Sequence, residues 1–174
     1  MDDILISIFA IVLSVVLMFI FPLMTMSDRN DDVAQLTVDI ATIEFVDTVR
    51  TTGVITRSEY DKFTSNIAST GNTYNIELEV SIKDENPGRK MTANSGGSDI
   101  GENVYYSIYT SQIEEMIRTK EEYKLKEGDV FSVSVKNTNQ TISQQLKNFF
   151  YTVVGKDTYI IAAAHAGLVT TTGN

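Results

Sequence analysis

The stretch Ile4–Met26, with the sequence ILISIFAIVLSVVLMFIFPLMTM, contains no charged residue. As an α-helix rising about 1.5 Å per residue, it would reach roughly 34 Å, which covers a hydrocarbon core of about 30 Å. Its polar side chains are the hydroxyls of Ser7, Ser14 and Thr25, and such hydroxyls can bond to carbonyls of the preceding turn. The stretch therefore predicts a single membrane-spanning helix over residues 4–26.

A cleaved signal peptide is the alternative interpretation of this stretch. Signal peptides begin with basic residues, have a shorter apolar core and end at a small-x-small cleavage site. This chain begins with the acidic Met1-Asp2-Asp3, and the run leads into Thr25-Met26-Ser27-Asp28. We therefore expect the helix to be kept as an anchor. Arg29 follows the run and no basic residue precedes it, which taken alone favours a cytoplasmic position for the rest of the chain.

The composition of the chain excludes several classes of function. Its 174 residues are enough for one domain and a small appendage. The formal charge of −9 argues against nucleic-acid binding, which needs clustered Lys and Arg to neutralise phosphates. The absence of cysteine excludes disulfides, Cys-ligated zinc, iron–sulfur clusters and thiol catalysis. One histidine is too few for a two-histidine metal site. We expect no cofactor and no nucleic-acid partner.

A second helical pattern follows the polar junction Asp28–Asp32 and ends before Gly53, a residue typical of helix C-termini. The pattern indicates one long rod over Asp3–Thr52, with a proline, Pro22, inside it. We assign residues 1–53 to this rod and 54–174 to a globular head. The apolar stripe of the second half consists of Val33, Leu36, Ile40, Ile43 and Val46, widened by Val38, Ala41, Phe45 and Val49.

The head is predicted to be a small α+β domain of three or four mainly antiparallel strands with two or three short helices. Residues Tyr74–Ile82 and Asp129–Lys136 alternate apolar and polar residues, as half-buried strands do. The other predicted strands are Val104–Tyr109 and Thr158–Val169, the latter expected in a central, well-covered position because its residues are small or apolar. Asp84–Glu102, rich in Gly, Ser and Asn, is predicted to be a loop.

Three short helices are expected in the head. Thr56 and Glu59 have the spacing of a capping box and predict a helix over Arg57–Ala68. A second helix is expected over Ser111–Arg118. The last helix is capped by Thr141 or Ser143, continues through Val154 to a stop at Gly155, and carries an apolar stripe of Leu146, Phe149, Phe150 and Val153.

The sequence nominates no catalytic or metal site. His165 stands between alanines of a predicted strand and is expected to be a half-buried structural residue. The acidic pairs Glu114-Glu115 and Glu121-Glu122 resemble a solvated helix face, and Asp28-x-x-Asp31-Asp32 lacks the ligand spacing of a calcium loop. Gly96-Gly97 lacks the Lys-Ser/Thr of a phosphate loop. Asn139-Gln140-Thr141 matches the glycosylation triplet, a match that is common by chance. We therefore expect the chain not to be an enzyme.

A charge-free N-terminal span with a proline, continued by an amphipathic helix and a small α+β head, resembles the type IV pilin superfamily. The likeness is closest to the short TadE-like proteins of tight-adherence (Tad) pilus systems in Gram-positive bacteria, and it extends over most of the chain. The stretches that carry it are Phe45–Arg50, Gly53–Tyr60, Tyr74–Glu79, Gly128–Asn137 and Ala163–Val169, with the closing Gly173-Asn174.

The resemblance implies a structural subunit, a major or minor pilin or pseudopilin, that polymerises through its N-terminal helix. Implied partners are further copies or related pilin-like subunits, membrane lipid before assembly, an assembly platform and a prepilin peptidase. The head would be extracellular, on a single-pass membrane protein or on an assembled filament. The residues implied in filament packing are Asp2, Asp3, Ile4, Phe9, Leu13, Phe19, Pro22, Leu36, Ile40 and Ile43.

Two features depart from the family pattern. Pilin precursors carry a basic leader ending in Gly, and neither the leader nor its cleavage site is seen in this sequence, so the resemblance implies either a mature chain or one that is not a processed subunit. The family often has a glutamate early in the mature helix, a place where this chain offers only Asp2 and Asp3, which would pair with a neighbour's N-terminal amine or simply flank the membrane. The alternative function is a single-pass membrane-anchored scaffold or docking component of a secretion or conjugation apparatus. A membrane-tethered enzyme is a third hypothesis.

Overall fold

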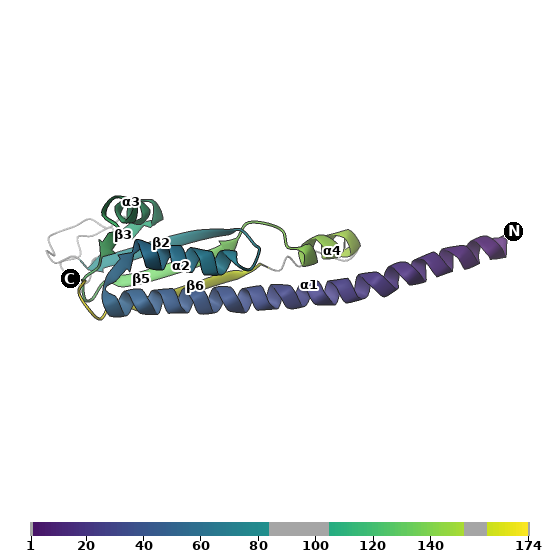
Figure 1. The fold of residues 1–174 in the computed structure, drawn as a ribbon, viewed down its shortest axis with the longest axis horizontal. Coiled ribbons are helices and arrows are strands. Elements are labelled where there is room, and N and C mark those ends of the chain that lie inside the picture. The colour runs from purple at the N-terminus through teal and green to yellow at the C-terminus, as the bar shows by residue number, and fades with distance from the viewer. Residues whose placement is uncertain (1, 84–104, 152–159, 174) are drawn as a thin grey trace, which may run out of the picture.

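A single helix, α1 (Asp2–Thr52), extends over most of the length of the molecule (Figure 1). The structure is a computed structural model that describes residues 2–83, 105–151 and 160–173. The helix continues through Pro22 and bends gently, and its second half lies against the head (Figure 1). Within the described residues it is the one helix long and apolar enough to cross a membrane. The predicted rod and the α+β class are confirmed, and the helix is compatible with a membrane anchor.

The end of α1 at Gly53 has a clear geometric cause. Gly53 has a φ of +71°, a value that residues with a Cβ rarely adopt, and its N–H donates to the carbonyl of Val49 at 2.8 Å. A Cβ at this position would lie 2.1 Å from the carbonyl oxygen of Thr171. The predicted stop at Gly53 is therefore confirmed, and the glycine also lets the C-terminal segment pass close to the end of α1.

The described part of the head contains two antiparallel sheets. The larger sheet has the strand order β3-β2-β5-β6, and the smaller one pairs β1 with β4. In the larger sheet Leu78 pairs with Val133, and Val133 pairs with His165. The strands are β1 (Val54–Thr56), β2 (Tyr74–Lys83), β3 (Tyr105–Tyr109), β4 (Glu122–Lys124), β5 (Val130–Asn137) and β6 (Ala162–Leu168).

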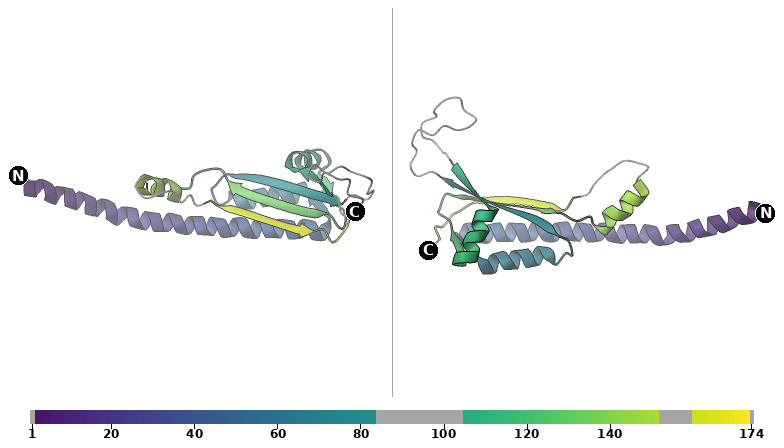
Figure 2. Two further views of the ribbon diagram at one scale, coloured as in Figure 1. Left: turned by 180° about the vertical axis from the view of Figure 1, so that it is seen from behind. Right: turned by 90° about the horizontal axis from the view of Figure 1, so that it is seen from above.

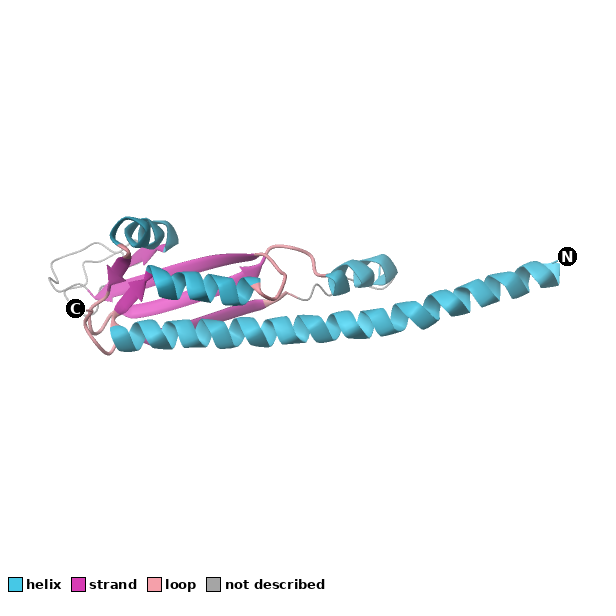
Figure 3. Cartoon of the chain, viewed as in Figure 1, coloured by secondary structure: helices cyan, strands magenta, loops and turns pink. Residues whose placement is uncertain are grey.

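Among residues 54–83, 105–151 and 160–173, the head also has three short helices (Figure 3): α2 (Arg57–Ala68), α3 (Thr110–Lys120) and α4 (Ile142–Tyr151). The capping box of α2 forms as predicted, because the Glu59 N–H donates to Thr56 Oγ1 at 3.2 Å and the Thr56 N–H donates to Glu59 Oε2 at 3.4 Å. Of the two candidate caps for the last helix, Thr141 is correct: its hydroxyl accepts from the N–H of Gln144 at 3.2 Å.

The core lies between one face of the large sheet and helices α1 and α2, which cover that face together (Figure 2). Alternation along β2 and β5 buries every second side chain, such as Leu78 and Val133, and leaves the opposite face to solvent. Phe45 of α1 stands at the centre of an aromatic cluster. Its ring stacks on Phe63 with a centroid distance of 4.6 Å and meets Phe131 edge-on at 5.7 Å.

The position predicted for the last strand is wrong. β6 is an edge strand rather than a central one, and the side chains of Ala162, Ala164 and Ala166 are exposed. On the inward face α1 passes close to the strand, and a Cβ at Gly167 would lie 2.9 Å from Cδ of Arg50. The approach of the helix explains the glycine at 167, whereas Ala162, Ala164 and Ala166 lie on the opposite, open face of the strand.

A side-chain amide caps the outer edge of β6 near its start. Gln35 of α1 accepts from the N–H of Ala162 at 3.0 Å and donates Nε2 to the carbonyl of the same residue at 2.8 Å. The amide thus occupies the place that a neighbouring strand would take at this residue. The contact ties the edge of the sheet to the long helix.

Two short strands were missed, and several predictions fall outside the described residues. Strands β1 and β4 were not predicted, since three residues are too few to show an alternating pattern. The last strand begins at Ala162, after Ile160 and Ile161, which are not in a strand, and its predicted start at Thr158 lies outside the described residues. The loop predicted over 84–102, the start of β3 at Val104, the continuation of α4 to Val154 and its stop at Gly155 lie outside the described residues.

Candidate packing surface on the long helix

The second half of α1 has two apolar faces that point in opposite directions. Ala34, Val38, Ala41, Phe45 and Val49 are buried against the head. They recur every three or four residues, so they line one face of the helix. The sequence predicted a single apolar stripe, but the structure divides its residues between two faces of the helix. Val46 and the residues expected to widen the stripe, Val38, Ala41, Phe45 and Val49, are buried in the core.

The opposite face remains exposed. Val33, Leu36, Ile40 and Ile43 are 60%, 59%, 48% and 44% exposed, and we call these four residues the outer ridge. Their spacing of three, four and three residues is that of a coiled-coil seam. The outer ridge lies beside the head and is separated from the uncharged run by Ser27 and the polar junction Asp28–Asp32. A membrane crossed by residues 4–26 would therefore leave the ridge uncovered.

The residues predicted to pack in a filament all lie on α1, but not on a single face. Leu36, Ile40 and Ile43 share the outer ridge, which Val33 completes. Phe9 and Leu13 fall, by their spacing, on the other side of the helix from the ridge. Six residues of the predicted set are exposed along the N-terminal half of α1: Asp3, Ile4, Phe9, Leu13, Phe19 and Pro22. This half of the helix lies at the end of the molecule far from the sheet (Figure 1). Asp2 begins the helix.

A polar network attaches α4 to α1 immediately after the uncharged run. The Thr141 hydroxyl donates to Asp31 Oδ2 at 2.7 Å, and the Ser143 hydroxyl donates to Asp28. Lys147 Nζ lies 2.6 Å from Asp28 Oδ1. The two acids, noted in the sequence only as a poor calcium motif, thus bind a helix more than a hundred residues away in the chain.

The two carboxyl groups of this network have opposite pKa shifts. Desolvation by burial raises the pKa of Asp31, and the hydrogen bond from Thr141 only partly offsets it. Desolvation also acts on Asp28, but the hydrogen bonds from Lys147 and Ser143 and the lysine's charge outweigh it and lower the pKa of Asp28. The ionised carboxylate of Asp28 therefore stabilises the attachment of α4 to α1. The ionised carboxylate of Asp31, by contrast, destabilises the folded state.

We expect Asp28→Asn to loosen α4 at neutral pH and Asp31→Asn to leave it as tight or tighter. The stabilisation from Asp28 is present above its unfolded pKa of about 3.8 and is lost as the pH falls through the lower folded value. Because the pair is partly exposed, the loss is about 0.5–1 kcal/mol. Hydrogen exchange of the α4 amides measures it, and the difference between the two variants should shrink on acidification below 3.8. Equal loosening by both variants at neutral pH would contradict this account.

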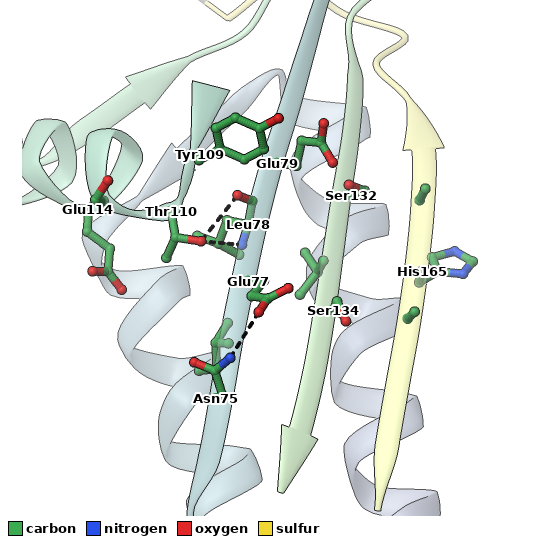
Figure 4. A pocket seen from close by; sticks show the side chains of 15 residues that line it. Asn75, Glu77, Leu78, Glu79, Tyr109, Thr110, Glu114, Ser132, Ser134 and His165 are labelled. Carbon is green, nitrogen blue, oxygen red and sulfur yellow. Dashed lines mark hydrogen bonds between the residues drawn. The ribbon is translucent and has the colours of Figure 1, made fainter. Parts of the chain in front are cut away.

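The outer face of the sheet carries a shallow hollow bordered by α3 (Figure 4). Glu77 pairs with Ser134 across the sheet and Glu79 with Ser132, so carboxylates and hydroxyls alternate on this face. Thr110 at the rim bonds to the backbone of Leu78, accepting from its N–H at 2.7 Å and donating to its carbonyl at 3.2 Å. The hollow can offer hydrogen bonds to a partner.

His165 belongs to β6 and is half-buried, as predicted. Its ring points away from Glu77 and Glu79 (Figure 4), so these groups do not form an acid–base pair. Within residues 2–83, 105–151 and 160–173, no three His, Cys, Asp or Glu side chains are grouped to hold a metal ion. Asn139 of the glycosylation triplet is used internally, since its Oδ1 accepts from the N–H of Thr73 at 2.9 Å.

Comparison of the chain with models of known protein families, with curated protein sequences and with solved structures gave no match. The surfaces described above are therefore the basis for assigning a function. Sequence reasoning found the residues of the outer ridge, but it did not separate them from the core face. It missed the attachment of α4 altogether, for which the only sequence signal was the acidic junction.

Proposed function

We propose that this protein is a structural subunit of a type IV or Tad-like surface filament, held in the membrane by the N-terminal half of α1 and polymerising through the exposed faces of that helix. The observation that carries the proposal is the outer ridge. Four aliphatic residues stand 44–60% exposed beside a folded head. A membrane crossed by residues 4–26 would leave these residues outside its hydrocarbon core. Isolated exposed apolar residues are ordinary, but a row in register on one helix indicates a packing surface.

A second copy of α1 fits this surface in composition and geometry. In the membrane, the run Ile4–Met26 offers apolar side chains all round the helix. Beyond the membrane, the seam spacing of the outer ridge suits a parallel or nearly parallel helix. When a subunit leaves the bilayer, its run loses lipid and needs another apolar environment, which neighbouring copies supply. In such an assembly the acidic heads face outward, on the extracellular side.

The test is to find the chain in filaments sheared from the cells that produce it naturally. Electron microscopy of the sheared fraction, with antibody against the head, should show fibres labelled along their length. Mass spectrometry of the mature N-terminus should show whether a leader has been removed. If the chain stays in the membrane fraction under every condition of shear and expression, and copurifies as a single copy with other machine components, the filament proposal fails and the anchored scaffold replaces it.

A further inference from the structure

Helix α4 has its polar side turned toward the protein and an apolar residue turned away from it. Thr141 at its cap, Ser143 and Gln144 are buried, whereas Ile142 is 70% exposed. Surface helices of globular proteins have the reverse arrangement, with the apolar face on the core. Leu146, one turn after Ile142 and on the same side by its spacing, is half-buried. This inverted pattern indicates that α4 meets an apolar environment outside its own chain.

The position of α4 along α1 identifies that environment. Its polar contacts are with Asp28 and Asp31, which follow directly on the end of the uncharged run at Met26. Ile20 and Met24, in the last turns of the run, are partly buried, whereas the other described residues of 3–26 are exposed. In Figure 3, α4 lies beside α1, displaced from the sheet toward the N-terminal half. The helix is therefore level with the end of the uncharged run.

We propose that α4 lies in the interfacial layer of the phospholipid membrane, with Ile142 toward lipid and the Asp28–Lys147 pair holding the helix at that depth. This inference rests on the membrane anchoring in the proposed function. A run that reaches roughly 34 Å ends close to the surface of a bilayer whose core is about 30 Å thick. Lipid is then in place beside α4 without a separate binding event, which favours lipid over a second copy of the chain.

The composition of α4 agrees with an interfacial helix. Such helices combine a polar face with Phe, Leu and other apolar residues and lie in the plane of the headgroups. The sequence of α4, ISQQLKNFFY, has this mixture and ends in aromatic residue types, which are enriched at membrane interfaces. Its one charged side chain, Lys147, is paired with Asp28 on the protein side rather than exposed on the apolar side.

The chain has no Trp, so a single introduced Trp reports its own position without background. Three variants of the full chain are compared in phosphatidylcholine–phosphatidylglycerol vesicles: Ile142→Trp in α4, Phe9→Trp in the uncharged run and Tyr109→Trp on the head. Phe9 and Tyr109 are 69% and 59% exposed, so each is a matched surface position. Quenching by lipids brominated near the headgroup or near the end of the acyl chain gives the depth of each Trp.

We expect the fluorescence of the Ile142→Trp variant to be quenched at least about twofold more than that of the head variant, and more by shallow than by deep bromines. If Phe9→Trp is quenched and Ile142→Trp behaves like the head variant, the proposal is wrong while the anchor stands. If Phe9→Trp is not quenched either, the anchor fails and this inference with it. The Trp at position 142 could instead be shielded from water to an extent that depends on protein concentration and not on lipid. That result would assign the exposed side of α4 to contact with a second copy of the chain and would overturn the proposal.

A nitroxide label provides an independent measurement, because the chain also has no cysteine. Ile142→Cys carrying the label should be more accessible to oxygen, which concentrates in lipid, than to a water-soluble nickel complex. The label at Tyr109→Cys should show the opposite preference. The same preference at both positions would overturn the proposal even if the Trp variant failed to fold.

Discussion

If the chain assembles through the outer ridge as proposed, Ile40→Glu is expected to reduce the yield of filaments at least about tenfold while leaving the head folded. Ile40 is 48% exposed at the centre of the outer ridge, so the isolated subunit loses little when it changes. In an assembled fibre, burying an aliphatic side chain of this kind contributes about 1.5–3 kcal/mol, and a buried carboxylate adds a penalty. Since about 1.4 kcal/mol is a factor of ten, and every subunit contact is affected, sheared filaments should fall at least about tenfold.

The matched control is Leu168→Glu. Leu168 is 54% exposed, and its replacement introduces the same charge in place of an aliphatic residue, but on β6 rather than on the outer ridge. Electron microscopy and quantitative blotting of the sheared fraction compare both variants with the unchanged chain, at equal levels of membrane-bound protein. Filaments made normally by Ile40→Glu would remove the ridge from the assembly. Equal loss in both variants would show that added negative charge, not the ridge, is responsible.

Phe45→Ala is expected to destabilise the head by about 3–5 kcal/mol, a large share of the stability of a domain of this size. Phe45 is 4% exposed and joins α1 to both α2 and the sheet through its contacts with Phe63 and Phe131. Removing the ring leaves a cavity where three elements meet. Urea unfolding of the full chain in detergent micelles, followed by near-ultraviolet circular dichroism of its tyrosines, measures the free energy of unfolding.

The comparison variant for this prediction is Ile43→Ala, two residues away on the outer ridge. Ile43 is 44% exposed, so its truncation should change the free energy of unfolding by no more than about 0.5 kcal/mol. The pair of variants distinguishes the two faces of α1 directly. Similar losses in both would mean that the inward and outward faces are not distinct in solution.

The sequence predicts those strands and helices that carry a local pattern within their own residues. Alternation in Tyr74–Ile82 and Asp129–Lys136 matches β2 and β5 within a residue or two, and the capping residues Thr56 and Thr141 mark the starts of α2 and α4. Strands β1 and β4 could not be predicted, because each has three residues and is defined by pairing with the other. β6 was misplaced because small residues are compatible with an open edge strand as well as with a covered central one.

The candidate site was predictable only in part, for a related reason. A period of 3.6 residues places apolar side chains on faces of α1, but it does not say which of two faces meets the head. That choice depends on the sheet, which forms from residues far along the chain. The attachment of α4 depends likewise on Thr141 and Ser143 reaching Asp31 and Asp28, 110 and 115 residues away. Local pattern contains no information on such partners.

The way in which the head is built on α1 has a mechanical consequence. Strands β2, β5 and β6 run beside α1, roughly along its length (Figure 1), and the buried row from Ala34 to Val49 joins the two. A tensile force applied along the helix therefore loads this interface in shear. The side chains of the row resist together instead of separating one after another, as they would if the head were peeled away. In a chain built this way, a pull on one end of the helix reaches the head through the whole buried row at once.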